Sequence, residues 1–367
     1  MTTRRNFLKT SAGIAASISV SGLAGCSGTS GKQPVEVSKD VKWPVIEGPN
    51  TPKLCISCGR GEQSMRDAKQ MGVDNILFTY PQIPWTVEDL QSIMDQYKAY
   101  GLTVCNIMIA GLENVIYAKP GRDETIEMVK QSIVAAGVVG LPVIEWNFYT
   151  DRLTEGYYYK EGRGGSGISA FDYAPVKDLP PRPGIDKYSA DQLWDNATYF
   201  LNAVIPVAEK AGVRMALHPN DPPPAISKGN PQIIATFDNW RRLLDIAKTP
   251  FHGMTFDPGV SYEMGLDPIE VMRMMGNQMN HAHYRNVITH EPYHKYEEVF
   301  FDVGQVNMFA VMQEHFKMGY NLYIFPEHPR FFSRDGEPGK PQRTGGTTGQ
   351  IYNVAYARAM MQAVMSI

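Results

Sequence analysis

The segment "NLYIFPEHPR" (residues 321–330) raises the question of fold, because an apolar run ends there in a cluster of reactive side chains. The run "LYIF" at its start is typical of a buried β-strand. Glu327, His328 and Arg330 follow almost at once. An acid, an imidazole and a guanidinium at a strand end belong either to a solvated loop or to the edge of a functional site.

Similar apolar runs recur along the chain before this one, and a stretch with helical periodicity follows each of them. The expected strands are 53–57, 75–80, 103–110, 142–149, 214–219, 253–258, 280–287 and 321–327, and the expected helices are 62–71, 86–100, 123–138, 190–211, 235–247, 268–277, 306–318 and 350–365. This alternation predicts an α/β fold of the (β/α)8 TIM-barrel type. An open doubly wound sheet is disfavoured, because no glycine-rich phosphate-binding turn follows the first strand. The segment 151–188, after the fourth strand, is expected to be a long loop.

The N-terminal residues 1–26 have the pattern of an export signal. Arg4 and Arg5 precede a weakly apolar stretch that is too short to span a membrane, which is typical of a twin-arginine signal. The box "LAGC" resembles a bacterial lipoprotein cleavage site with Cys26 as the lipidated residue, although ordinary cleavage nearby is the alternative. We therefore expect a periplasmic protein or a membrane-anchored lipoprotein, in contact with the membrane only through a lipid anchor. Residues 27–50 are expected to form a tether.

Residues 51–367 are expected to form one TIM-barrel catalytic domain. The net charge of −3 and the pI near 6.3 provide no basic field, so a nucleic-acid partner is disfavoured. Cys55 and Cys58 form a lone C-x-x-C pair, which does not support a zinc ribbon. We interpret these two residues and Cys105 as buried free thiols, with a disulfide as the alternative in an oxidising compartment.

Metal-capable side chains lie at the ends of four consecutive expected strands. The strand ends carry His218, Asp257, His283 and Glu327. Because the C-terminal ends of barrel strands meet at one mouth, these side chains are expected to converge. Two imidazoles and two carboxylates suit Mn²⁺, Fe²⁺ or Mg²⁺ better than a structural zinc ion. His281 lies two residues before His283 on the same strand face, so we expect it one layer deeper, in the core or supporting the ligands.

Further polar residues at this mouth suggest substrate contacts. Arg285 and Arg330 could each hold a carboxylate through the planar guanidinium, or could instead form salt bridges with loop acids. Asn220 and Asp221 lie in a proline-dense loop after the fifth strand, where they could position ligands or substrate, or simply form a turn. The substrate expected from these groups is a small molecule that bears a carboxylate or several hydroxyls.

Several of these motifs together resemble the mannonate dehydratase family. The similar segments are "ALHPNDPPP", "NWRRLLDIAKTPFHGMTFDPG", "HYRNV" and "VNMFAVMQEHFKMGYNLYIFPEHPR", which cover most of residues 213–330. The resemblance implies a xylose-isomerase-like barrel and a divalent metal, typically Mn²⁺. It also implies the removal of water from D-mannonate to give 2-keto-3-deoxygluconate.

The ligand set departs from that of the family, which uses His, Cys, His and Asp. The corresponding positions here carry His218, Asp257, His283 and Glu327, so a thiolate is replaced by a harder carboxylate ligand. Asp, His and Glu on the last three strands are similar to the sugar isomerases and epimerases of the same superfamily. Isomerisation, epimerisation or a lyase reaction on a keto-sugar or glycoside is therefore the alternative activity, and a non-catalytic sugar-binding lipoprotein is a second alternative.

The resemblance also implies the proton carriers. The family's "DHGR" becomes "EHPR", which retains His328, and a tyrosine of the last helix corresponds to Tyr352 or Tyr356. His328 and one of these tyrosines would form the acid–base pair of a β-elimination. Because a mannonate dehydratase proper is expected in the cytoplasm, the predicted export favours an extracytoplasmic sugar acid or glycoside derivative. Assembly into a homo-oligomer is left open.

Overall fold

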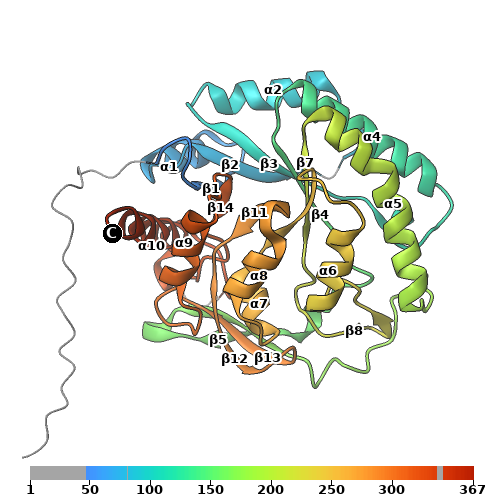
Figure 1. Cartoon of the computed structure of the whole chain (residues 1–367). Coiled ribbons are helices and arrows are strands. Elements are labelled where there is room, and N and C mark those ends of the chain that lie inside the picture. Colours follow the sequence, from blue (N-terminus) through green and yellow to red (C-terminus); the bar gives the residue numbers. More distant parts are fainter. Residues whose placement is uncertain (1–46, 81, 337–341) are drawn as a thin grey trace, which may run out of the picture. The chain divides into compact units, whose positions relative to one another are not determined.

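Eight parallel strands form a closed barrel in the computed structural model, which describes residues 47–80, 82–336 and 342–367. Around the barrel the strand order is β1-β14-β11-β10-β7-β4-β3-β2. The strands are β1 (Lys53–Ser57), β2 (Asn75–Tyr80), β3 (Thr103–Ile109), β4 (Val143–Asn147), β7 (Arg214–His218), β10 (His252–Phe256), β11 (Met279–His283) and β14 (Tyr323–Phe325). These are the eight segments predicted from the sequence, so the (β/α)8 prediction is confirmed (Figure 1).

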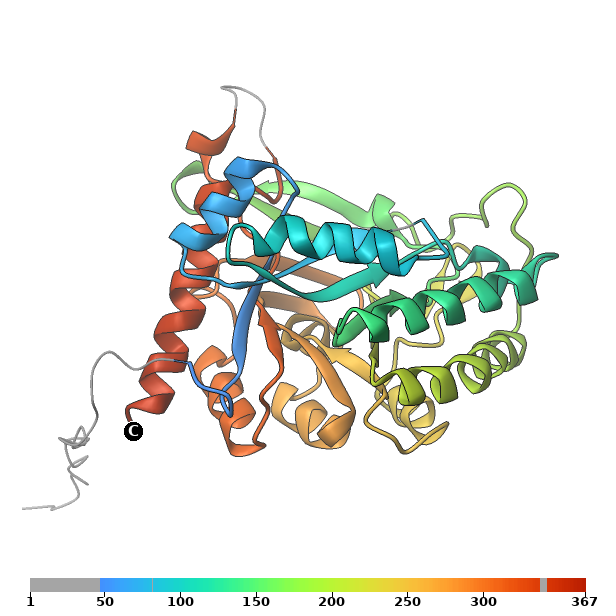
Figure 2. The same ribbon diagram turned by 90° about the horizontal axis from the view of Figure 1, so that it is seen from above.

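Helices cover the outside of the barrel, as Figures 1 and 2 show. They are α1 (Glu62–Gln70), α2 (Val87–Lys98), α3 (Glu113–Ile116), α4 (Arg122–Val138), α5 (Ala190–Ala211), α6 (Phe237–Asp245), α7 (Pro258–Glu263), α8 (Pro268–Met275), α9 (Met308–Lys317) and α10 (Thr347–Met365). The sequence determines their ends locally. Helix α5, for example, begins with a capping box between Ser189 and Gln192, and it ends at Gly212, whose φ of 72° suits a residue without a Cβ.

A second, antiparallel sheet lies at one end of the barrel and was not predicted. Its order is β12-β13-β6-β5, formed by β5 (Tyr157–Glu161), β6 (Gly167–Asp172), β12 (Asn286–Glu291) and β13 (Lys295–Val299) (Figure 1). The prediction of a long loop over 151–188 was therefore wrong in part, because the glycine-rich stretch inside it is a hairpin turn between β5 and β6. The expected strand 280–287 is also divided: β11 ends at His283, and β12 of the second sheet begins at Asn286.

The three described cysteines are free and buried, as the sequence interpretation expected. Cys55 and Cys105 lie in β1 and β3, and Cys58 lies one residue beyond β1. None of the described helices is long and apolar enough to cross a membrane. The predicted signal over residues 1–26, including Cys26, and most of the predicted tether lie outside the described residues.

Candidate metal centre

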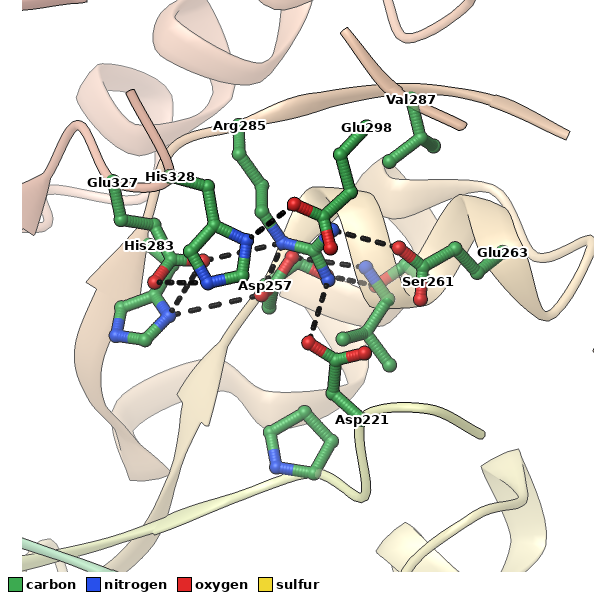
Figure 3. A network of polar contacts seen from close by, with 12 residues as sticks. Asp221, Asp257, Ser261, Glu263, His283, Arg285, Val287, Glu298, Glu327 and His328 are labelled. Carbon is green, nitrogen blue, oxygen red and sulfur yellow. Dashed lines mark hydrogen bonds and ion pairs between the residues drawn. The ribbon is translucent and has the colours of Figure 1, made fainter. Parts of the chain in front are cut away.

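The four predicted ligands meet at the C-terminal ends of neighbouring strands. His218 ends β7 and His283 ends β11. Asp257 directly follows β10, and Glu327 follows β14. His283 Nδ1 lies 3.2 Å from His218 Nε2 and 3.6 Å from Asp257 Oδ2. The same nitrogen lies 3.1 Å from Glu327 Oε1 (Figure 3). All four side chains are buried.

The two imidazoles are oriented so that one nitrogen of each faces the other ligands. His218 donates from Nδ1 to the Pro219 carbonyl at 2.7 Å, which leaves Nε2 as the acceptor. His283 Nε2 lies 3.4 Å from Glu145 Oε1, which leaves Nδ1 as its acceptor. Glu145 is itself fixed, because it accepts from Thr255 Oγ1 at 2.8 Å and from Asn106 Nδ2 at 2.9 Å. Carboxylates and carbonyls commonly set the orientation of metal-binding histidines in this way.

The geometry of this group fits a divalent cation. Donor atoms about 2.1 Å from such an ion lie about 3.0–3.5 Å apart in tetrahedral or octahedral arrangements. The donor atoms of His218, Asp257 and His283 all lie within 4.8 Å of one another, with contacts of 3.2–3.7 Å, and Glu327 Oε1 adjoins this group 3.1 Å from His283 Nδ1. Glu327 Oε1 is buried and accepts no hydrogen bond, although it lies 3.2 Å from Arg285 Nε and 3.1 Å from His283 Nδ1, so it retains a lone pair that a bound cation would satisfy.

Two other groups of potential ligands lie near this one: Glu145, His281 and His283, and Asp221, Glu298 and His328. In the first, Glu145 already accepts hydrogen bonds from two neighbours, and in the second the carboxylates are paired with arginine and tyrosine side chains. His281 is fully buried, in ring contact with His283, and burial lowers its pKa to about 4. Because it lies two residues before His283 in β11, it is placed one layer deeper in the barrel than that residue.

The electrostatic field at the centre favours positive charge. Burial opposes the charged form of His283, but the carboxylates of Glu327 and Glu145 outweigh it and raise its pKa well above the ordinary value. Burial would raise the pKa of Asp257, but Arg285 and the two histidines hold it well below its usual range. The same carboxylates that favour a proton on His283 would stabilise a metal ion in its place.

Metal affinity is therefore expected to depend on pH. A divalent ion and a proton compete for His283 Nδ1, so affinity is greatest above the raised pKa of His283 and falls by about tenfold for each pH unit below it. Titration calorimetry of the metal-free protein with Mn²⁺ checks this, in two buffers of different ionisation enthalpy. Release of about one proton per ion is the expected result. An affinity that stays constant between about pH 6 and about pH 8, with no proton released, would contradict it.

Arg285 connects the ligand Asp257 to two further carboxylates, those of Glu263 and Asp221. Its Nε lies 2.9 Å from Asp257 Oδ2, its Nη1 lies 2.7 Å from Glu263 Oε1, and its Nη2 lies 3.4 Å from Asp221 Oδ2 (Figure 3). The guanidinium lies against Gly259, where a Cβ would approach it to 2.7 Å, so the glycine of the "DPG" motif is required by packing. The sequence left two roles open for Arg285, substrate binding or salt bridges. The structure contains the salt bridges, since each nitrogen of the guanidinium contacts a carboxylate of the chain itself.

His328 lies beside the ligands with an unusual backbone conformation. Its φ is 44°, a left-handed value that non-glycine residues rarely adopt. Its Nε2 lies 3.5 Å from Glu327 Oε2, and its Nδ1 lies 2.9 Å from Glu298 Oε2. Arg330 is also buried and donates to Glu298 Oε2 at 2.9 Å, so it too follows the salt-bridge alternative. Asn353 of α10 holds the Glu327 carbonyl at 2.7 Å.

The two polar residues of the loop after β7 have different surroundings. Asn220 is fully buried and bonds to the backbone of Phe148 and Ile234, so it forms the turn and supports the loop. Asp221 faces the centre: its Oδ1 accepts from Tyr157 Oη at 2.6 Å, and its Oδ2 pairs with Arg285. The structure thus brings Asp221, but not Asn220, to the cluster.

The predicted tyrosines are directed elsewhere. Tyr352 donates to Asp302 Oδ1 at 2.5 Å, and Arg163 donates to the Tyr352 hydroxyl at 3.4 Å. Tyr356 packs against Phe301 and against the ring of Tyr352. Within residues 47–80, 82–336 and 342–367, no hydrogen bond or ring contact joins either tyrosine to the four ligands. The tyrosine hydroxyl that reaches the cluster belongs to Tyr157 of β5.

Sequence reasoning missed four residues of the cluster. Glu145 carried a usable signal, because it is a lone acid inside the apolar segment "PVIEWNFY". Glu263 lies one helical turn after the Asp-Pro-Gly motif, and this position was a weaker sequence indication of a role at the site. Tyr157 and Glu298 carried none, because they come from the second sheet, which was not predicted.

Replacing Glu145 by Gln is expected to weaken metal binding by about 10- to 100-fold, the usual effect of losing a carboxylate that orients a histidine ligand. An amide can present its NH₂ to His283 Nε2 and so favour the wrong tautomer. Calorimetric titration with Mn²⁺ measures the effect. Glu314→Gln is the matched control, since Glu314 is a buried carboxylate paired with Arg273 away from the centre. Equal affinities in both variants would refute a role for Glu145.

The closed barrel is a TIM barrel of the xylose-isomerase-like type, and it carries a buried imidazole–carboxylate centre at its mouth. The TIM-barrel protein of that type from Mycobacterium smegmatis, solved in complex with magnesium, superimposes with a TM-score of 0.54 at 12% identity, covering 88% of this chain and 100% of that one. The mannonate dehydratase of Streptococcus suis serotype 2 superimposes with a TM-score of 0.76 at 24% identity, covering 86% and 94%.

The family model for D-mannonate dehydratase (UxuA) matches residues 58–367. The chain therefore belongs to the D-mannonate dehydratase (UxuA) family and is a hydro-lyase, which confirms the family and enzyme predictions. Mannonate dehydratase 2 of Halalkalibacterium halodurans is 29% identical over 316 residues, covering 77% of this chain and 88% of that relative.

Proposed function

We propose that this chain is a divalent-metal-dependent sugar-acid dehydratase that converts D-mannonate, or a closely related aldonate, to a 2-keto-3-deoxy acid. Membership of the family supports the reaction class. The observation that carries metal dependence is the convergence of His218 Nε2, His283 Nδ1, Asp257 Oδ2 and Glu327 Oε1, the last without a hydrogen bond.

The reaction is a β-elimination, in which the C2 proton and the C3 hydroxyl leave as water and the resulting enol becomes the 2-keto acid. A bound divalent cation would stabilise the negative charge that develops as the C2 proton leaves. The ligand set of two imidazoles and two carboxylates suits Mn²⁺ best, with Fe²⁺ and Mg²⁺ as further candidates. The burial of these ligands excludes bulk water and strengthens each electrostatic contact.

His328 would transfer one of the two protons through Nε2, the ring nitrogen that faces Glu327. Tyr157 and Asp221 are placed to handle the second proton, since their oxygens are 2.6 Å apart at the cluster. Tyr157 thus takes the proton-transfer role that the sequence analysis gave to Tyr352 or Tyr356 of the last helix. Arg285 would keep Asp257 ionised, and its contacts with Glu263 and Asp221 would hold these two side chains in place.

An assay of the Mn²⁺-loaded protein over a panel of aldonates tests the proposed reaction. Loss of one water and a product that reacts as a 2-keto-3-deoxy acid are expected, and treatment with a chelator should abolish both. A product of unchanged mass from a ketose or keto-glycoside would instead establish isomerisation or epimerisation. Sugar binding without turnover in metal-loaded protein would favour the non-catalytic alternative.

We also propose that the chain is exported by the twin-arginine route, on the basis of Arg4 and Arg5. Folding before export would let the cytoplasm determine which metal is loaded, whereas periplasmic Cu²⁺ or Zn²⁺ binds most N/O sites more tightly. Replacing both arginines by lysine should retain the protein inside the cell, as fractionation would show. Unchanged export of that variant would exclude this route.

A further inference from the structure

The inner face of the second sheet is directed at the metal centre. Side chains alternate along β13, so Tyr296 and Glu298 share one face and Lys295 and Glu297 share the other. Tyr296 Oη lies 3.3 Å from Asp221 Oδ1, and Glu298 bonds to His328. The other face carries ion pairs unrelated to the centre, such as Glu297 with His290 at 2.7 Å.

Glu298 and Arg330 together fix the position of His328. Glu298 Oε2 accepts from His328 Nδ1 at 2.9 Å and from Arg330 Nη2 at 2.9 Å. Arg330 also donates to the Glu298 carbonyl at 3.0 Å, and to the His328 carbonyl from Nε at 2.9 Å and from Nη2 at 2.7 Å. Both the ring and the left-handed backbone of His328 are thereby held by one closed network, and Glu298 and Arg330 are only 4% and 1% exposed.

The orientation that results has a chemical consequence. A carboxylate can only accept, so the contact with Glu298 requires a proton on His328 Nδ1. The lone pair, or the exchangeable proton, is then on Nε2, which lies 3.5 Å from Glu327 Oε2 on the side of the metal ligands (Figure 3). A buried carboxylate that selects the histidine tautomer in this way is a recurrent arrangement in acid–base catalysis.

We propose that Glu298 is a positioning residue for the dehydration, which keeps Nδ1 of His328 protonated and presents Nε2 to the substrate. The inserted sheet is therefore part of the catalytic apparatus and not only a cover for the barrel. The proposal rests on the proposed function for the role of His328, but the orientation of the ring follows from the contacts alone.

Nitrogen NMR of the wild-type enzyme, labelled with ¹⁵N-histidine, tests the orientation without any variant. The chain has eight histidines, and the signals of His328 are identified by their loss in His328→Asn. In metal-free protein and in protein loaded with diamagnetic Mg²⁺, Nδ1 of His328 should carry a proton. A neutral ring protonated only at Nε2 would overturn the proposal, whatever the activity of the enzyme.

Glu298→Gln tests the consequence for catalysis. We expect kcat to fall by at least about 10²-fold with KM changed by less than about threefold, and the ¹⁵N signals of His328 to move towards the other tautomer. The matched control is the adjacent Glu297→Gln, which removes the carboxylate paired with His290 on the outer face and should leave kcat unchanged. An unchanged kcat in Glu298→Gln, or an equal loss in both variants, would refute the positioning role.

The two proposals can fail separately. If the wild-type enzyme dehydrates no aldonate but the NMR signals show the expected tautomer, the proposed function fails and the arrangement of Glu298 and His328 holds for whatever reaction occurs. If dehydration is confirmed and the tautomer is the opposite one, the positioning role fails alone.

Discussion

Asp257→Asn is expected to lower the affinity for Mn²⁺ by more than about 100-fold and to abolish dehydration. Asp257 Oδ2 lies 3.7 Å from His218 Nε2 and 3.6 Å from His283 Nδ1, so it is a direct ligand in the proposed centre. Its other oxygen, Oδ1, accepts from the Val260 amide at the start of α7. Asparagine retains this cap through its carbonyl oxygen but removes the negative charge, so the variant separates metal binding from helix capping.

The chain contains a matched control for this substitution. Asp267, like Asp257, precedes a proline and caps a helix, with Oδ1 accepting from the Ile269 amide at 2.9 Å, but it lies outside the centre. Asp267→Asn should leave Mn²⁺ affinity and turnover unchanged. Thermal unfolding of both metal-free variants establishes that each is folded. Tight Mn²⁺ binding by a folded Asp257→Asn protein would remove Asp257 from the ligand set.

His328→Asn is expected to reduce kcat by about 10²- to 10⁴-fold, the range for loss of a general acid or base, with Mn²⁺ affinity changed by less than about tenfold. His328 Nε2 lies 3.5 Å from Glu327 Oε2, close enough to reach a substrate at the metal but not itself among the four ligands. Asparagine is suited to this position because it tolerates the left-handed φ of 44°. The loss therefore reports chemistry and not backbone strain.

His290→Asn is the corresponding control, because His290 also pairs with a glutamate of β13 but on the outer face of the sheet. Turnover in this variant should match the wild type. A His328→Asn enzyme that retains Mn²⁺ and loses no rate would exclude His328 as a proton carrier. Loss of metal along with activity would instead assign it to the metal centre.

The barrel and the meeting of the four candidate ligands near its mouth could be predicted, because each depends on a local pattern that repeats. Apolar runs followed by helical periodicity recur along the chain, and closure of the barrel alone brings His218, Asp257, His283 and Glu327 to one mouth. No side-chain packing has to be known for this step. The pairing of imidazoles with carboxylates then follows from the types of residue at the strand ends.

The residues around the ligands could not be predicted, because they depend on long-range pairing of polar segments. Glu298 reaches His328 only because β13 pairs with β6, more than a hundred residues earlier in the chain. Both strands are short, and β13 is mostly polar, so it does not stand out in the sequence as a buried strand. The same sheet places the Tyr157 hydroxyl at the cluster, where it bonds to Asp221. Of the two tyrosines expected from the last helix, Tyr352 bonds to Asp302 instead.

The central claim is that four side chains of the barrel mouth bind one catalytic divalent ion. A crystal structure of the Mn²⁺-loaded protein, with anomalous data collected at the manganese edge, tests it most directly. We predict one strong peak about 2.1–2.3 Å from His218 Nε2, Asp257 Oδ2, His283 Nδ1 and Glu327 Oε1. A peak among Glu145, His281 and His283, a peak among Asp221, Glu298 and His328, or no peak in Mn²⁺-saturated crystals would contradict the account.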